Sequence, residues 1–298
     1  MSREVLQDIN CEALVGRFCV HCDAKQLNNP WKTHMKCTHL IAAMILFVAN
    51  ACNADVEPPK AEAADEWQVL FNGTDLTGWT PKFHHHEVGD NYANTFRVVD
   101  GSIEVNYDEY GAFEERYGHL FYEVPFSSFH LTFEYRFTDQ WLEDAPDYTY
   151  RNSGIMFHSQ DPATILKEQD WPISVEYQML ADAGDGQPRP TGNMCSPGTD
   201  VYFEGELDSR HCISSSSATY PWDEWVSGDL IVYEDSLVIH KVNGDTVLQY
   251  TKTQVGGGVA NGFDPAFKVD GTPLTEGYIG LQAEGQGVAF RNIKIKEL

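Results

Sequence analysis

Short runs in which apolar and polar residues alternate follow one another from residue 67 to the end of the chain. The clearest is FHLTFEYRF, residues 129–137, where every second residue is Phe, Leu or Tyr. Asp100-Gly101 and Asn243-Gly244 each separate two such runs and predict β-hairpins, because these dipeptides favour tight hairpin turns. No run keeps a helical period, apart from a turn near residues 161–169. We therefore predict an all-β domain, a jelly-roll β-sandwich of two antiparallel sheets.

One of these runs, ISVEYQML at residues 173–180, carries polar residues on one face. Its odd-numbered positions, from Ile173 to Met179, are apolar and suit a protein core. Glu176 and Gln178 project together from the opposite face, because alternate side chains of a strand share a side. Such a face usually contacts only water. The alternative is that it lines a site, and the pattern leaves both interpretations open.

Other runs repeat this feature, with polar side chains on a strand that is otherwise apolar. If one sheet is concave, these side chains would converge and form a pocket suited to sugar hydroxyls, which need paired donors and acceptors. Aromatic rings could stack on the apolar face of a sugar. The polar candidates are Glu134, Arg136, Asn152, His158, Gln282 and Arg291, and the aromatic candidates are Trp171, Tyr148 and Trp141. The alternative is a solvated face on which Glu134 and Arg136 form a weak surface ion pair.

The chain is strongly acidic, with 45 Asp and Glu against 20 Lys and Arg and a net charge of −25. This balance argues against a nucleic-acid partner, since phosphates need a basic surface. A neutral ligand such as a carbohydrate suits it. We predict no cofactor and no metal site: His84, His85 and His86 are adjacent, and neighbouring residues of an extended chain point in different directions. A requirement for a divalent metal stays open.

The first part of the chain has the features of an export signal that begins at Met35. Lys36 precedes an apolar run at residues 40–49, which is too short to span a bilayer as an ordinary helix. Ala49-Asn50-Ala51 then fits a cleavage site of small residues. Cys52 follows directly and resembles the lipidated cysteine of bacterial lipoproteins, so a lipid-anchored and a freely secreted protein are both open.

We therefore predict four parts and an exported protein that is periplasmic, extracellular or anchored to a membrane through Cys52. The parts are a spurious extension at 1–34, a signal peptide or lipoprotein signal at 35–54, a linker at 55–66 and the β-sandwich domain at 67–298. The domain holds two cysteines, Cys195 and Cys212. In an oxidising compartment they would form a disulfide, and the alternative is two free thiols.

Several segments, in their order along the chain, resemble the 3-keto-disaccharide hydrolase family, a domain formerly of unknown function. They are LFNGTDLTGW from Leu70, RNSGIMFH from Arg151, SVEYQML from Ser174, the segment from Trp225 through GDLIVYEDSLVIHKVNGDTV, GYIGLQAEG from Gly277 and FRNIKIKEL from Phe290. The resemblance covers residues 67–298. It implies a concanavalin-like lectin/glucanase fold and the cleavage of glycosides whose ring is oxidised at C3.

The implied reaction removes the hydrogen at C2, which the neighbouring ketone acidifies, and expels the aglycone from C1. It needs a base, an acid and a group that stabilises an enolate. Our hypothesis assigns the base to Glu176 or His158, a second carboxylate to Glu134 and the enolate to Arg136 or Arg291. Substrate binding falls to Asn152, Gln178, Gln282 and Trp171.

The chain departs from the family at one position, because Glu284 stands where relatives often have His. This change affects the ligand or one proton transfer. Two other functions stay open on the same fold, a non-catalytic carbohydrate-binding module and a structural domain of the cell envelope.

Overall fold

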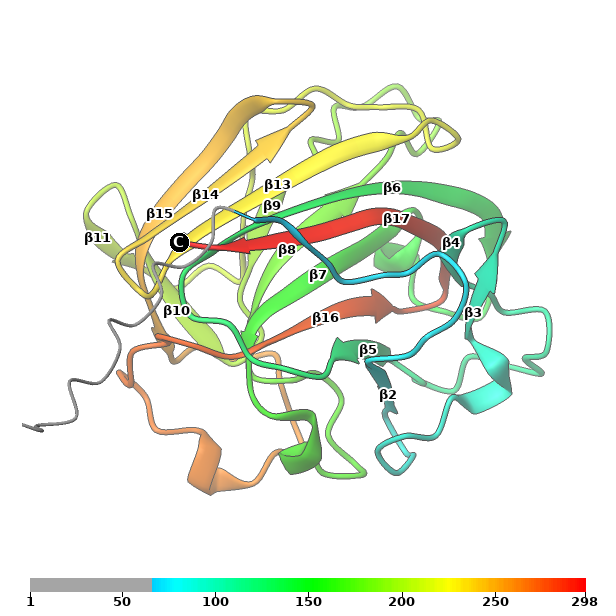
Figure 1. Ribbon diagram of the computed structural model, residues 1–298, viewed down its shortest axis with the longest axis horizontal. Coiled ribbons are helices and arrows are strands. Elements are labelled where there is room, and N and C mark those ends of the chain that lie inside the picture. The colour runs from blue at the N-terminus through cyan, green and yellow to red at the C-terminus, as the bar shows by residue number, and fades with distance from the viewer. Residues whose placement is uncertain (1–65) are drawn as a thin grey trace, which may run out of the picture. The chain divides into compact units, whose positions relative to one another are not determined.

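The computed structural model of the protein describes residues 66–298, which form two antiparallel β-sheets packed into a sandwich (Figure 1). The large, 10-stranded sheet has the order β11 (Glu206–Asp208), β10 (Thr199–Phe203), β15 (Asp245–Val255), β14 (Leu237–Val242), β13 (Val226–Tyr233), β6 (Phe129–Trp141), β17 (Gln286–Glu297), β4 (Ser102–Val105) and β3 (Phe96–Val99), and β1 (Gln68–Val69) pairs with β17. The small, 7-stranded sheet has the order β12 (Cys212–Ile213), β9 (Asn193–Cys195), β8 (Val175–Leu180), β7 (Asn152–Ser159), β16 (Tyr278–Ala283), β5 (Gly118–Tyr122) and β2 (Trp79–Phe83). The predicted all-β jelly-roll sandwich is confirmed.

Both predicted hairpins are present. Asp100 and Gly101 join β3 to β4, and Asn243 and Gly244 join β14 to β15. All four residues have a positive φ, between 48° and 90°. Turns with positive φ at both central residues match the right-handed twist of the paired strands, which is why Asn, Asp and Gly occupy them.

The core lies between the sheets, and β6 supplies much of it. Its inward side chains are at most 2% exposed and are Phe129, Leu131, Phe133, Tyr135 and Phe137. The Phe133 ring meets the Tyr177 ring of β8 edge to face, with ring centres 5.2 Å apart. The Tyr135 hydroxyl is 2.6 Å from the Thr191 hydroxyl and hydrogen-bonds to it, so the buried polar end of the Tyr135 side chain has a hydrogen-bond partner.

Three glycines inside strands are covered by phenylalanine rings of the neighbouring strand. The directly opposed pairs are Gly228 with Phe133, Gly118 with Phe83, and Gly280 with Phe121. A Cβ on any of these glycines would lie within 3.0 Å of the ring, at 2.3, 2.1 and 2.9 Å respectively. The glycines therefore keep their positions because the ring occupies the space that a side chain would need.

Packing also decides which way β8 faces. Val175, Tyr177 and Met179 are fully buried in the core between the sheets. Since side chains alternate along a strand, Glu176 and Gln178 project from the opposite face of the small sheet. This strand lies within the segment ISVEYQML, and its apolar alternate residues form the core face that the sequence predicts.

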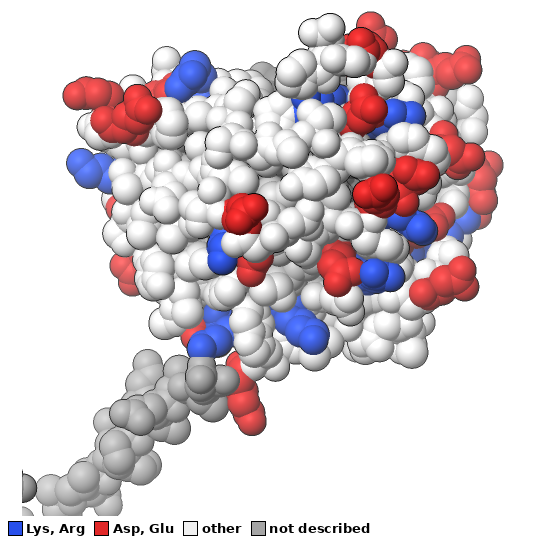
Figure 2. Space-filling model, turned by 90° about the horizontal axis from the view of Figure 1, so that it is seen from above, with Lys and Arg blue, Asp and Glu red and all other residues white. Residues whose placement is uncertain are grey.

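The outer surface reflects the acidic composition. Figure 2 shows one face of the molecule, on which Asp and Glu side chains outnumber the scattered Lys and Arg. The described residues include no helix that could cross a membrane. The predicted extension, signal peptide and Cys52, and residues 55–65 of the predicted linker, lie outside the described residues, so these boundaries stay predictions.

Replacing Gly228 by alanine tests the ring-covered glycines. The new Cβ would lie 2.3 Å from the Phe133 ring in a closely packed core, so we expect a loss of about 1–3 kcal/mol in the free energy of unfolding. Urea denaturation measures it. Gly258→Ala is the matched control, because a Cβ there meets nothing within 4 Å. Equal stabilities for the two variants would contradict the close packing of the Phe133 ring over Gly228.

Candidate functional site

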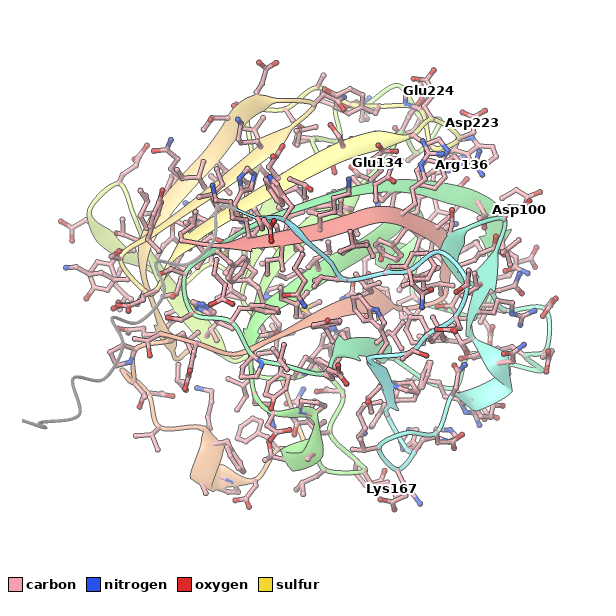
Figure 3. The ribbon with its side chains drawn as sticks, in the orientation of Figure 1. Asp100, Glu134, Arg136, Lys167, Asp223 and Glu224 are labelled. Carbon is pink, nitrogen blue, oxygen red and sulfur yellow. A yellow bond between two sulfur atoms is a disulfide. The ribbon has the colours of Figure 1, made fainter. Side chains whose placement is uncertain are left out.

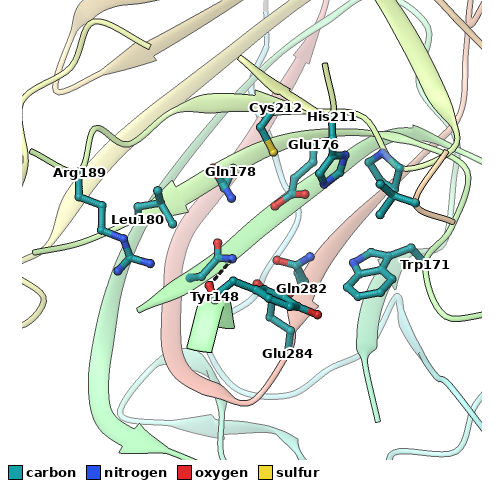
Figure 4. A pocket seen from close by; sticks show the side chains of 13 residues that line it. Tyr148, Trp171, Glu176, Gln178, Leu180, Arg189, His211, Cys212, Gln282 and Glu284 are labelled. Atoms are coloured by element: carbon teal, nitrogen blue, oxygen red, sulfur yellow. Dashed lines mark hydrogen bonds between the residues drawn. The ribbon is translucent and has the colours of Figure 1, made fainter. Parts of the chain in front are cut away.

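A pocket of about 510 Å³ lies on the face of the small sheet that is turned away from the large sheet (Figure 4). Strands β8, β7 and β16 form its floor, and loops form its walls. The lining residues are Tyr148, Asn152, Trp171, Glu176, Gln178, Leu180, Arg189, Pro197, His211, Cys212, Val259, Gln282 and Glu284. The volume and the mixture of apolar walls with a few polar groups are typical of small-molecule sites.

Glu176 is a buried carboxyl group of the floor, with 5% of its surface exposed. It is paired with Met156 of β7, and its side chain leans over Gly154, the neighbouring position of β7 on the same, pocket-facing side. A Cβ on Gly154 would lie 2.2 Å from a carboxylate oxygen of Glu176, so only glycine leaves room for it. Burial disfavours the charged form and raises the pKa of Glu176 to about 8.

Glu284 is the second carboxyl group of the pocket and lies in the turn after β16. It is 3% exposed, and its Oε1 has no hydrogen-bond partner. Burial raises its pKa well above the usual range, and the nearby Glu176 raises it further. Gly285 shapes the turn with a φ of 101°, and its amide donates to the Tyr107 hydroxyl at 2.7 Å.

Three amide side chains complete the floor. Asn152 donates to the Tyr148 carbonyl at 3.0 Å, which leaves its Oδ1 without a partner. The Oε1 of Gln282 is likewise buried and unpartnered. Gln178 Oε1 accepts a hydrogen bond of 3.0 Å from Asn193, which leaves its NH₂ group free to donate. The floor thus presents several acceptors and one oriented donor to a ligand.

The two ends of the pocket differ in character. Trp171 and His211 lie at one end, and Arg189 and Leu180 at the other (Figure 4). The Trp171 ring packs on Tyr117 at 4.0 Å between ring centres, and the Tyr117 and Tyr148 hydroxyls hydrogen-bond at 2.8 Å. This arrangement holds flat apolar surfaces beside the polar floor, as sugar rings require.

A disulfide between Cys195 and Cys212 closes one side of the pocket. The two cysteines are directly opposed on β9 and β12, and Cys195 is in turn opposite Glu176 of β8. The bond therefore fixes the edge strand of the small sheet next to the Glu176 carboxyl. Of the two alternatives left open by the sequence, the disulfide is the one that the structure contains.

Six of the residues expected at the site come together in this pocket. They are Glu176, Gln178, Asn152, Gln282, Trp171 and Tyr148. Trp141 does not line it, and its ring nitrogen donates to the Thr149 hydroxyl. The polar face of ISVEYQML is therefore the floor of a cavity rather than a solvated surface.

Three other expected residues lie on the large sheet and do not line the pocket. Figure 3 places Glu134 and Arg136 on β6, and Glu134 accepts a 2.7 Å hydrogen bond from Arg291 of β17. Both guanidinium groups contact the Trp225 ring, at 4.9 Å for Arg136 and 3.9 Å for Arg291. These side chains form a cluster on the surface of the large sheet, as in the solvated alternative, but the ion pair joins Glu134 to Arg291 and not to Arg136 as that alternative expected.

His158 shares the parity of Asn152 on β7 but does not reach the pocket. Its φ is 45°, and the register of β7 with β16 shifts at this point, so the alternation breaks. Its ring lies 6.0 Å from the Phe129 ring, and its Nε2 donates to the Ser127 carbonyl at 2.9 Å. The expectation that the polar residues of all these strands converge on one face is therefore wrong for His158, as it is for the large-sheet residues.

The comparisons with known proteins identify the family. Residues 66–296 match the 3-keto-alpha-glucoside-1,2-lyase-like domain. The chain belongs to this family. It is 26% identical to a 3-keto-disaccharide hydrolase of Bacteroides thetaiotaomicron over 255 residues, which covers 79% of each protein. The predicted resemblance is confirmed, and with it the expectation of an enzyme of the glycoside hydrolase type.

Solved structures with similar folds are also known. One is a Parabacteroides distasonis protein provisionally named a glycosyl hydrolase, with a TM-score of 0.47 and 23% identity over 79% of this chain and 95% of that one. Another is the carbohydrate-binding module CBM66 of Bacillus subtilis, with a TM-score of 0.44 and 11% identity over 77% of this chain and 100% of that one.

Sequence reasoning about this family member missed several residues of the pocket. The sequence marks Glu284 only as a departure from the family, and it does not indicate that Arg189, His211 or Cys212 line a site. All four lie outside the three floor strands, in turns or at an edge. Strand alternation carries no information about such positions, because loops return to the sheet only in the folded chain.

The close contact between Gly154 and Glu176 can be tested with a double-mutant cycle. Gly154→Ala should cost about 1–3 kcal/mol of unfolding free energy, because the Cβ overlaps the carboxyl group. In a Glu176→Ala background this overlap is gone, and the same substitution should cost much less. Urea denaturation of the four proteins measures the coupling. Additive effects would show that the two residues do not compete for space.

The raised pKa of Glu176 predicts a pH-dependent stability. Between about pH 4.5 and 8 the folded protein binds a proton that the unfolded chain releases, so this residue lowers stability as the pH rises. Glu176→Gln should therefore match the wild type near pH 4.5. At pH 8 it should be more stable by on the order of a few kcal/mol. Melting curves of both proteins across this pH range measure the difference. If the difference is the same at every pH, the pKa of Glu176 is not raised and its carboxyl group is exposed to water.

Proposed function

We propose that the protein cleaves glycosides whose sugar ring carries a ketone at C3, and that the reaction takes place in the pocket. Two buried carboxyl groups in one cavity, Glu176 and Glu284, carry this proposal. Family membership and the name of the Bacteroides relative support it. A pair of carboxyls with unequal environments is how proteins hold a base and an acid in one site.

The chemistry follows from the ketone. A base takes the hydrogen from C2, and its electron pair is shared with the C3 oxygen as an enolate. The electrons then form a C1–C2 double bond, and the C1–O bond to the aglycone breaks. An acid supplies the proton that the leaving oxygen needs. Addition of water across the double bond, with OH at C1 and H at C2, completes a net hydrolysis.

Each step has a matching group in the pocket. Glu176 has no hydrogen-bond partner among the described residues and serves as the base. Glu284 has a pKa raised further, stays protonated and serves as the acid. The free NH₂ group of Gln178 stabilises the enolate oxygen. Asn152 and Gln282 accept hydrogen bonds from sugar hydroxyls, and Trp171 stacks on the ring.

Turnover of a chromogenic 3-keto-glucoside tests the assignment. Glu176→Gln should lower kcat/KM by about 10²–10⁴-fold, since a positioned base contributes that much. In the wild type, kcat/KM should rise about tenfold per pH unit and level off above about pH 8, because only the ionised Glu176 is active.

Glu134→Gln is the control, because that carboxyl lies on the large sheet away from the pocket, and we expect it to retain full turnover. Unchanged turnover in Glu176→Gln would remove this residue from the base role. No aglycone release by the wild type, together with saturable binding of unoxidised oligosaccharides, would instead identify a carbohydrate-binding module.

We further propose that the protein is exported. The disulfide between Cys195 and Cys212 supports this, because such bonds persist in oxidising compartments. The apolar segment before Cys52 agrees with it. Intact-mass analysis of the protein from its native cell should show cleavage within residues 49–52, with added lipid mass if Cys52 is the anchor. A chain that retains residues 35–51 would contradict export through this signal.

A further inference from the structure

Two adjacent histidines and a glutamate meet outside the pocket, where three segments of the chain come together. His84 and His85 lie in the turn after β2, and Glu168 lies in the loop between η4 (Pro162–Thr164) and β8. We propose that these three residues form a binding site for a divalent transition-metal ion such as Zn²⁺. The site is separate from the pocket and does not depend on the function proposed for it.

The side chains are already close enough for a shared ion. The His84 and His85 rings are stacked, with centres 3.6 Å apart and planes inclined by 26°. One potential ligand atom from each of the two histidines and from Glu168 lies within 4.8 Å of the others. Imidazole and carboxylate groups together favour Zn²⁺, Cu²⁺ or Ni²⁺ over Ca²⁺ or Mg²⁺.

The backbone explains how neighbouring histidines share a side. In an extended chain their rings would point in opposite directions, which is why the sequence predicts no site here. His85 has a φ of 70°, in the left-handed region, and this turn brings both rings together. Backbone hydrogen bonds hold the turn, from His84 N to the Tyr117 carbonyl at 2.8 Å and from His85 N to the Lys167 carbonyl at 2.9 Å.

Hydrogen bonds also orient the rings for a metal. His84 Nδ1 donates to the Glu115 carbonyl at 2.8 Å, so the lone pair of the ring is on Nε2. His85 Nδ1 lies 2.7 Å from Glu168 Oε2, so these two atoms are close enough to bind one ion. The ligands we propose are therefore Nε2 of His84, Nδ1 of His85 and Oε2 of Glu168, and water completes the coordination.

An ion at this position would tie the site to the wall of the pocket. It would link the turn after β2 to the loop that carries both Glu168 and Trp171; Figure 3 shows Lys167, which belongs to this loop. Tyr117 contacts both sides, with ring centres 6.4 Å from His84 and 4.0 Å from Trp171. We expect bound metal to hold this loop in place.

The third histidine of the run provides a matched control. His86 Nδ1 is hydrogen-bonded to Asp90 at 2.8 Å, and its ring packs on Tyr92 at 4.6 Å between ring centres. It shares the sequence context of His84 and His85 but is not part of the cluster. Removing it should leave metal binding unchanged.

Equilibrium dialysis of the full chain against ZnCl₂, read by elemental analysis, tests the site. The N-terminal segment contains other Cys and His residues, so the readout is the difference from wild type. We expect His84→Ala and His85→Ala each to lose one bound Zn²⁺ per chain or at least tenfold in affinity. His86→Ala should lose neither. Zn²⁺ should also slow proteolysis of residues 160–172 in the wild type and in His86→Ala, but not in His84→Ala.

A crystal soaked in ZnCl₂ locates the ion directly through its anomalous signal. We expect a peak at the nitrogen edges of the stacked His84 and His85 rings, next to the Glu168 carboxylate. The absence of a peak there, an equal effect of all three histidine substitutions, or no loss of Zn²⁺ from His84→Ala and His85→Ala would each overturn the proposal. Turnover of a 3-keto-glucoside by these variants is a separate measurement, so failure of one proposal leaves the other intact.

Discussion

The packing of Tyr177 between the sheets is the contact on which the site depends. Its ring lies 5.2 Å from Phe133 and 4.6 Å from His240, measured between ring centres, and its hydroxyl donates to the Lys241 carbonyl at 2.9 Å. These contacts fix the register of β8. A slip of one residue would turn Glu176 into the core and Tyr177 into the pocket, and both changes are costly.

The buried polar groups in the floor of the pocket reduce the stability of the folded protein. Two carboxyl groups are buried there without a basic partner in salt-bridge contact, and three acceptor oxygens of the floor, Asn152 Oδ1, Gln282 Oε1 and Glu284 Oε1, have no partner within the described chain. Such an arrangement lowers stability. It persists because the surrounding sheet, the disulfide of Cys195 and the close fit of Gly154 leave the side chains no alternative position. Sites that must bind polar ligands commonly carry this cost.

The two outward faces of the sandwich show how one sequence pattern has two outcomes. On the large sheet, Glu134 and Arg291 are partly exposed and neutralise each other beside Trp225. On the small sheet, Glu176 and Gln178 are covered by loops and by the turn that carries Glu284. In the sequence, both faces have the same pattern, with polar residues at alternate positions of a strand. Only the covering by loops removes water from one of them and raises the pKa of its carboxyl groups.

The sequence by itself determined the all-β sandwich, the two Gly hairpins, the core face of β8 and four polar residues of the pocket floor, which are Glu176, Gln178, Asn152 and Gln282. These follow from local rules, since strand alternation and turn chemistry act within a few residues. Only the tertiary structure decided that Glu134, Arg136 and Arg291 belong to the other sheet, that a bulge turns His158 inward, and that Glu284 faces Glu176. It also brought His84 and His85 together through one positive φ. Such positions depend on which strands pair and where loops return, and a linear pattern does not contain that information.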